Sequence, residues 1–145
     1  MKKSDQSLYN ICIASIKRKT IKPYNFQWTQ LYDSDFNTKL FFQNFPIDFE
    51  EEELIICSVI IDPDNYSILT TRKLVTNNKG NIESGSMMNA KNKWCGEFKN
   101  KTDQYTLGEV ELATGERLSY FVETDKASMI MIYGVNTLLD ISKES

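Results

Sequence analysis

The stretch Leu69-Thr70-Thr71-Arg72-Lys73-Leu74 lies between two groups of turn-forming residues, Asp62-Pro63-Asp64-Asn65 and Asn77-Asn78-Lys79-Gly80. Proline fixes φ, Asp and Asn side chains hydrogen-bond to nearby backbone amides, and Gly or Asn supplies the positive φ of a tight hairpin. Apolar and β-branched residues fill the chain on both sides of the first turn. The pattern predicts antiparallel strands over 54–61 and 66–76, and the first reads as a central strand covered on both faces. Arg72 and Lys73 fall within the second of these strands.

Further strands are predicted towards the C-terminus. A short strand is expected over Trp94–Phe98, followed by a polar turn over Asn100–Gln104. The segments Tyr105–Leu112 and Leu118–Val122 flank Thr114-Gly115-Glu116, which is a third hairpin signal. The sheet is therefore expected to be a meander of five or six antiparallel strands.

Helical spacing of apolar residues occurs at both ends of the chain. Leu8, Ile11, Cys12 and Ile16 predict an amphipathic helix over 6–18, and Pro23 would end any extension of it. A second helical pattern begins at Trp28 and runs to Phe45, with a possible break at Asp33-Ser34-Asp35 where Ser34 could cap a second piece. Asp125 or Ser128 can cap a closing helix over Met129–Ile141.

Because helices and strands are segregated along the chain, the predicted fold class is α+β. The 145 residues are enough for one domain with its own core. We expect a single domain over 1–145, in which a helical N-terminal part, 1–50, packs on the sheet and C-terminal helix of 53–141. The sheet could be curved or closed into a barrel.

The strand Tyr66-Ser67-Ile68-Leu69-Thr70-Thr71-Arg72-Lys73-Leu74-Val75, in a meander closed by a C-terminal helix, resembles bacterial pleckstrin-homology-like (GRAM-type) domains over residues 53–141. Such domains often have a tyrosine, a leucine–threonine pair and a basic residue in an early strand. The resemblance implies a small barrel-like scaffold that binds lipids, peptides or proteins, usually without catalysis. Lipid-binding members use a basic cluster at the mouth between early strands, whereas the loops here carry Asp62, Asp64 and Lys79.

Charge and cysteine content narrow the classes of function. The net charge of −3 argues against a general nucleic-acid binder, which neutralises phosphates with clustered Lys and Arg. No apolar segment reaches the length of about 18 residues that a membrane span needs. Cys12, Cys57 and Cys95 are odd in number and widely spaced, so reduced thiols and a cytoplasmic location are expected.

The sequence lacks the usual catalytic residue sets. It contains no histidine, which removes the commonest general base and zinc ligand. Three distant cysteines do not suggest a metal site, and no glycine-rich phosphate loop precedes a helix. The acid pairs Asp33/Asp35, Asp62/Asp64 and Glu109/Glu111 are explained by caps, turns and a solvent-facing strand side. We therefore expect no catalytic residues, no metal and no cofactor.

Charge is distributed unevenly along the chain. The basic segment Lys17–Lys22 contrasts with an acidic run at residues 48–53, and either could be only a solvated surface. The favoured hypothesis is a bacterial immunity protein that neutralises a basic toxin domain through acidic residues: Asp48, Glu50, Glu51 and Glu52, with Asp62 and Asp64 as further contacts. One alternative is a pleckstrin-homology-like module that uses Lys17–Lys22 on anionic headgroups or binds a peptide. Another is a small enzyme that uses carboxylates.

Overall fold

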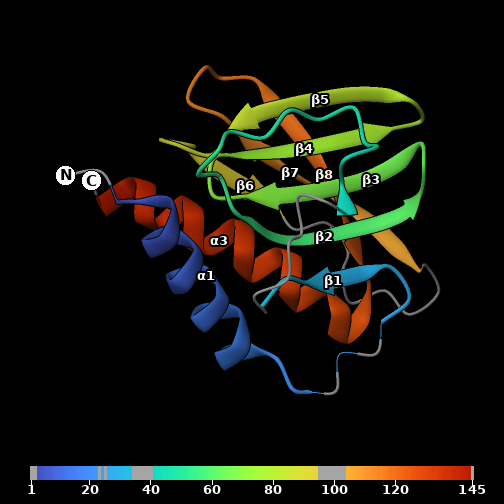
Figure 1. Cartoon of the computed structure of the whole chain (residues 1–145), viewed down its shortest axis with the longest axis horizontal. Helices are drawn as coiled ribbons and strands as arrows, with labels where there is room; N and C mark the ends of the chain where they lie inside the picture. The colour runs from blue at the N-terminus through green and yellow to red at the C-terminus, as the bar shows by residue number, and fades with distance from the viewer. Residues whose placement is uncertain (1–2, 23, 25, 34–40, 95–103, 145) are drawn as a thin grey trace.

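The computed structural model describes residues 3–22, 24, 26–33, 41–94 and 104–144. The element order is α1 (Asp5–Lys19), β1 (Thr29–Leu31), β2 (Ile55–Asp62), β3 (Asn65–Thr70), β4 (Lys73–Asn78), β5 (Asn81–Ser86), β6 (Asn92–Trp94), β7 (Tyr105–Glu111), β8 (Arg117–Glu123), the 3₁₀ turn η1 (Asp125–Ala127) and α3 (Ser128–Glu144). This order confirms the α+β class (Figure 1).

The strands form two antiparallel sheets. The first has the order β1-β2-β3-β4-β5 and the second has the order β6-β7-β8, so within each sheet every described strand pairs with its sequence neighbours. A single meander of five or six strands was expected. The described residues instead show a five-stranded meander, a separate three-stranded sheet and no closed barrel.

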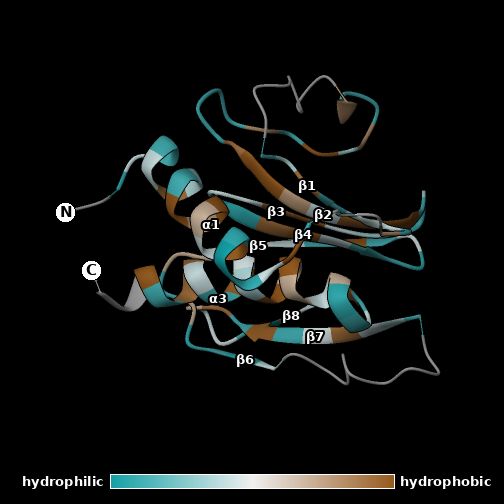
Figure 2. Cartoon of the chain, turned by 90° about the horizontal axis from the view of Figure 1, so that it is seen from below, coloured by the Kyte–Doolittle hydropathy of each residue, from teal (hydrophilic) through white to brown (hydrophobic). Residues whose placement is uncertain are grey.

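The main core lies between the two sheets and the two long helices. In Figure 2 the five-stranded sheet lies on one side, the three-stranded sheet on the other, and α3 runs between their planes. α1 packs on α3, and β8 contacts β2, β3, β4 and β5. Buried residues of every one of these layers meet in one cluster, which includes Ile16 of α1, Cys57 of β2, Val122 of β8 and Met131 of α3.

The opposite face of the five-stranded sheet is covered by aromatic residues of the segment before β2. Phe42, Tyr66, Ile55 and Ile68 form a second buried cluster. The Phe45 ring stands edge-on to Tyr66, with 5.1 Å between ring centroids. Strand β2 is therefore buried on both faces along residues 55–59, as its continuous apolar sequence predicts.

Both turns that flank β3 and β4 are confirmed. The side chain of Asp62 accepts a hydrogen bond from the amide of Asp64 at 2.8 Å, which makes the turn between β2 and β3. Lys79 and Gly80 have φ values of 55° and 86° in the turn between β4 and β5. Two successive positive φ angles are the geometry that an Asn- and Gly-rich hairpin favours.

The strand predicted over 66–76 is wrong, because the chain reverses in its middle. β3 ends at Thr70, β4 begins at Lys73, and Leu69 pairs with Leu74 across the new hairpin. The Thr70 hydroxyl accepts hydrogen bonds from the amides of Arg72 at 3.1 Å and Lys73 at 3.0 Å, so a side chain makes the turn that Gly, Pro or Asn would ordinarily make. Arg72 therefore lies in the turn and is exposed, and not within a strand as expected.

The helical pattern that begins at Trp28 is also wrong at its start. Residues Thr29–Leu31 form β1 and pair antiparallel with β2, with Thr29 opposite Val59. The side chain of Glu123 on β8 accepts hydrogen bonds from the amides of Gln27, Trp28 and Thr29 at 2.9–3.0 Å, and from the Thr29 hydroxyl at 2.7 Å. A carboxylate with four donors holds this segment extended. The N-terminal part therefore contributes a strand as well as a helix, and the expected cap at Ser34 lies outside the described residues.

The remaining elements follow their predictions with smaller differences. α1 spans Asp5–Lys19 where a helix over 6–18 was expected, and Ser4 caps it by accepting from the Ser7 amide. The strands on either side of Thr114-Gly115-Glu116 are β7 and β8. β6 shares only Trp94 with the strand expected over 94–98, and residues 95–103, with most of the expected polar turn, lie outside the described residues. α3 begins at Ser128, whose hydroxyl donates to the Asp125 carbonyl at 2.5 Å.

Within the described residues, no helix is both long and apolar enough to cross a membrane.

Candidate functional site

The acidic run before β2 forms a loop that is built on one buried carboxylate. Glu53 is fully buried, and its Oε1 accepts a hydrogen bond from the Glu50 amide at 2.9 Å. The Glu53 amide in turn donates to the Glu50 carbonyl at 3.2 Å. The Thr70 hydroxyl donates to Oε2 of Glu53, so the loop is attached to the hairpin between β3 and β4.

Lys73 fixes the other side of the same loop. Its ammonium lies 3.5 Å from Oε1 of Glu53 and donates to the backbone carbonyl of Asp48. The same ammonium lies 5.4 Å from the centre of the Phe49 ring, which packs on the second buried cluster, that of Phe42 and Tyr66. The ammonium of Lys73 therefore contacts Asp48 at the start of the loop, Glu53 after its end, and the ring of Phe49.

The loop presents four exposed carboxylates on this fixed base: Asp48, Glu50, Glu51 and Glu52. One of them, Glu52, lies 4.0 Å from the guanidinium of Arg72. We call residues 48–52 the acidic loop. The structure thus brings together four of the six acidic residues that the sequence singled out.

The other two acidic residues lie elsewhere. Asp62 and Asp64 are exposed in the turn at the far end of β2. A strand rises about 3.3 Å per residue, so the eight residues of β2 separate this turn from the acidic loop by about 23 Å. Asp62 also accepts from the side-chain amide of Asn65 at 3.0 Å, which is a local role within the turn.

Beside the acidic loop, the first turn of α1 is attached to the sheet by Asp5. Its carboxylate receives the Arg72 Nη2 at 2.7 Å and Nε at 3.0 Å, and the Thr71 hydroxyl at 2.6 Å. The hydrogen bonds from Arg72 hold the pKa of Asp5 below its ordinary value, and the same contact raises the pKa of Arg72. This pair gives α1 a fixed position next to the acidic loop.

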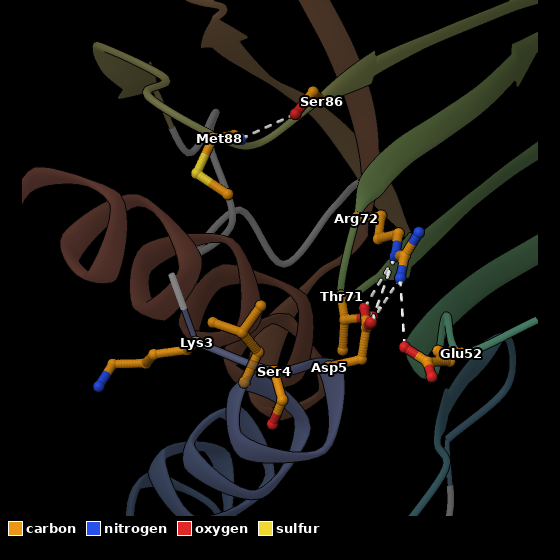
Figure 3. A pocket seen from close by; sticks show the side chains of 9 residues that line it. Lys3, Ser4, Asp5, Glu52, Thr71, Arg72, Ser86 and Met88 are labelled. Carbon is orange, nitrogen blue, oxygen red and sulfur yellow. Dashed lines mark hydrogen bonds and ion pairs between the residues drawn. The ribbon is translucent and has the colours of Figure 1, made fainter. Parts of the chain in front are cut away.

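A pocket of about 520 Å³ opens between the start of α1 and the adjacent turns (Figure 3). It is lined by Lys3, Ser4, Asp5, Leu8, Glu52, Thr71, Arg72, Ser86 and Met88. Arg72 points towards Asp5 and Glu52, whereas the side chain of Lys3 points away from them. Within this pocket the guanidinium of Arg72 is already paired with Asp5.

The two described cysteines are poor nucleophiles. Cys12 and Cys57 are both fully buried in the main core. Burial raises the pKa of the Cys12 thiol to about 12, and it raises the pKa of Cys57 as well. The thiolate is the reactive form, so both side chains are inert near neutral pH. Cys95 lies outside the described residues.

The remaining acid pairs have local partners. Glu109 lies on the outer side of β7 and pairs with Arg117 at 3.5 Å, while Glu111 accepts from Asn92 at 3.1 Å. Asp33 pairs with Lys17 at 3.3 Å, and Asp35 is not among the described residues. Over the part of the chain that the structure describes, no three His, Cys, Asp or Glu side chains are grouped so that they could hold a metal ion.

Sequence reasoning missed two organising carboxylates: Glu53, which holds the acidic loop, and Glu123, which holds the segment of β1. In the sequence Glu53 reads as the last member of an acidic run, although it lies only two residues before the buried strand β2, and that position is a usable signal. Glu123 ends β8 and gave no such signal, because its donors come from residues nearly a hundred positions earlier.

A scan against protein-family models, a search of curated proteins and a search of solved structures each find no match to this chain.

Proposed function

We propose that this protein is a non-catalytic, protein-binding inhibitor, and specifically a bacterial immunity protein that neutralises a toxin by covering its active site with the acidic loop. The observation that carries the proposal is the construction of that loop. Four exposed carboxylates stand on a base fixed by the buried Glu53 and by Lys73.

A fixed loop lowers the cost of binding. Association normally requires ordering of side chains and loops at the interface, and a segment held in place before binding avoids part of that loss. The backbone of the acidic loop is held at Asp48 by Lys73 and at Glu50 by Glu53. The backbone that carries these charges is therefore held in place on the domain before a partner binds.

The charge of the loop indicates the chemistry of the partner. Four carboxylates attract a basic surface over a long range and accelerate encounter at low ionic strength. Many toxin domains are basic nucleases, and an acidic surface can occupy their active sites. The inert thiols of Cys12 and Cys57 and the lack of histidine also favour binding over covalent chemistry.

Asp62 and Asp64 are kept in the proposal as outer contacts. An interface of standard size covers about 800 Å² on each partner, which is enough to extend over about 23 Å. Loss of these two carboxylates is expected to weaken binding less than loss of the loop carboxylates.

The decisive experiment is rescue of growth. The chain is co-expressed with the toxin domain encoded by an adjoining gene. The wild type is expected to restore growth, whereas a variant combining Asp48→Asn, Glu50→Gln, Glu51→Gln and Glu52→Gln is expected to fail while retaining wild-type thermal unfolding.

The matched control neutralises four exposed carboxylates elsewhere: Glu83→Gln, Glu116→Gln, Asp125→Asn and Asp140→Asn. It has the same net charge as the loop variant and is expected to rescue growth. If both variants rescue equally well, the acidic loop is not the binding site. If no adjoining gene product is neutralised by the wild type, the proposed function is wrong.

A further inference from the structure

A second charged surface lies at the end of α1 that is farther from the acidic loop. The last turn of α1 and the residues after it carry Lys17, Arg18, Lys19 and Lys22, and all four are exposed. Figure 1 shows this end of α1 at the margin of the molecule, away from strands β2 to β5. We call residues 17–22 the basic end of α1.

The basic end of α1 carries an exposed apolar residue. Ile21 is 88% exposed, the highest value among the large apolar side chains that the structure describes. The neighbouring chain is held in place, because the Thr20 hydroxyl donates to the Ile16 carbonyl at 2.8 Å and lies 2.6 Å from the hydroxyl of Tyr24. Ile21 is thus exposed next to Thr20, whose side chain is held by these two contacts.

The cations around Ile21 are only partly neutralised. Among the described residues, Asp33 is the carboxylate that pairs with them, at 3.3 Å from Lys17 and 3.9 Å from Lys22. Lys19 and Lys22 also lie over the rings of Tyr133 and Tyr24, each at 5.8 Å from the ring centre. Counting the described residues alone, four cations and one carboxylate leave a local charge of +3, on a chain whose net charge is −3.

We propose that the basic end of α1 docks on an anionic lipid bilayer, with Ile21 inserted at the boundary between headgroups and acyl chains. An exposed isoleucine gains free energy when it leaves water for lipid. Lys and Arg side chains close to an anionic leaflet add favourable charge interactions. On a bilayer, burial of Ile21 and attraction of the surrounding cations would both favour binding. A nucleic acid would bind the cations and leave Ile21 in water.

The position of the acidic loop fits this orientation. Asp5 at the start of α1 pairs with Arg72 beside Glu52, so the acidic loop lies near the first turn of the helix. The 15 residues of α1 span about 22 Å. An anionic surface that attracts the basic end of α1 repels the acidic loop, and the docked molecule turns that loop towards solution.

The test is flotation of the full chain with vesicles of phosphatidylcholine, with and without phosphatidylglycerol. Binding is expected only to the anionic vesicles, and it should weaken as salt screens the charges. Arg18→Gln with Lys19→Gln should lower the partition coefficient roughly 25-fold, since each cation near the surface contributes on the order of a fivefold factor. Ile21→Ser should lower it roughly tenfold.

The matched control is Lys79→Gln with Lys91→Gln, which removes two exposed cations elsewhere and should bind like the wild type. The proposal is overturned if anionic vesicles do not bind, or if binding is unchanged by the Arg18, Lys19 and Ile21 substitutions. It is also overturned if duplex DNA binds more tightly than the vesicles and its binding does not depend on Ile21. The acidic-loop variant should bind vesicles at least as well as the wild type, so this test is independent of the proposed function.

Discussion

At the scale of single residues, Glu53 shows how a charge can be buried at low cost. Its carboxylate receives the Glu50 amide, the Thr70 hydroxyl and the ammonium of Lys73. Buried charges require such partners, because an ion without them loses its hydration and gains nothing in return. The contact with the Glu50 amide, together with the hydrogen bond from Lys73 to the Asp48 carbonyl, fixes the backbone of the acidic loop, so stability and the proposed binding site depend on the same side chains.

Glu53→Gln is therefore expected to lower the free energy of unfolding by about 2 kcal/mol, because it removes the ion pair and turns one buried acceptor into a donor. Urea unfolding at neutral pH measures the change. Glu83→Gln on the exposed strand β5 serves as the control, and its effect should be within about 0.5 kcal/mol of zero. An equal decrease in the free energy of unfolding in the two variants would show that Glu53 has no special role in stability.

Asp5 predicts a pH dependence. Arg72 lowers its pKa from the ordinary value of 3.8, so the folded protein favours the ionised carboxylate more than the unfolded chain does. The stabilisation is complete above pH 3.8 and is lost as the pH falls through the lowered pKa. The difference in unfolding free energy between the wild type and Asp5→Asn should shrink over that acidic range. A difference that does not change there would contradict this assignment.

At the scale of elements, prediction from sequence succeeded where a turn or helix carries its own chemistry. The Asn77–Gly80 turn has residues suited to positive φ, and α1 has an apolar stripe at helical spacing. Prediction from sequence failed at Thr70–Lys73, because a threonine hydroxyl makes that turn. Threonine is common in strands, so the residue type did not indicate a turn.

The candidate site also contains parts that could be predicted from local sequence and parts that depend on tertiary contacts. The four acids of the loop are neighbours in sequence and remain neighbours in space, but Asp62 and Asp64 lie at the other end of β2. Spacing along the chain could not predict Glu123 as the partner of residues 27–29, because that contact exists only after the two sheets have packed. β1 has only three residues and its aromatic neighbours have helical spacing, so its strand state follows from tertiary contacts.

Glu123→Ala is expected to release β1. The amides of Gln27, Trp28 and Thr29 would lose their acceptor, and their hydrogen exchange should accelerate by about tenfold to a hundredfold beyond the change caused by lower global stability. Thr29→Ala removes only one of the four hydrogen bonds and should have a smaller effect. Uniform acceleration across the whole chain would mean that Glu123 stabilises the fold without holding β1 in particular.

At the scale of the whole molecule, one core joins both helices to both sheets. The Ser67 hydroxyl on β3 accepts a hydrogen bond from the Phe121 amide on β8 at 2.8 Å, so the sheets are linked by a polar contact within the apolar cluster. α3 also approaches the first sheet closely, because a Cβ on Gly134 would lie 2.8 Å from Leu69. Such continuous packing predicts that the chain unfolds as one unit.

Two single-tryptophan proteins test this cooperativity. Trp94→Phe leaves Trp28 to report on the region of β1, and Trp28→Phe leaves Trp94 to report on β6. Their fluorescence transitions in urea should share one midpoint with the far-UV circular dichroism, after correction for the stability of each variant. A separate transition of the Trp94 signal would show that the three-stranded sheet unfolds on its own.

Strand β5 lies at one edge of the five-stranded sheet, and no described strand pairs with its outer side. An open border of this kind invites edge-to-edge aggregation, in which chains add to one another as extra strands. β5 opposes this with polar side chains and the charge of Glu83, and Ile82 is its one large apolar residue. The sheet therefore carries its own protection against fibre-like growth, located on a strand that contributes no buried residue to the core.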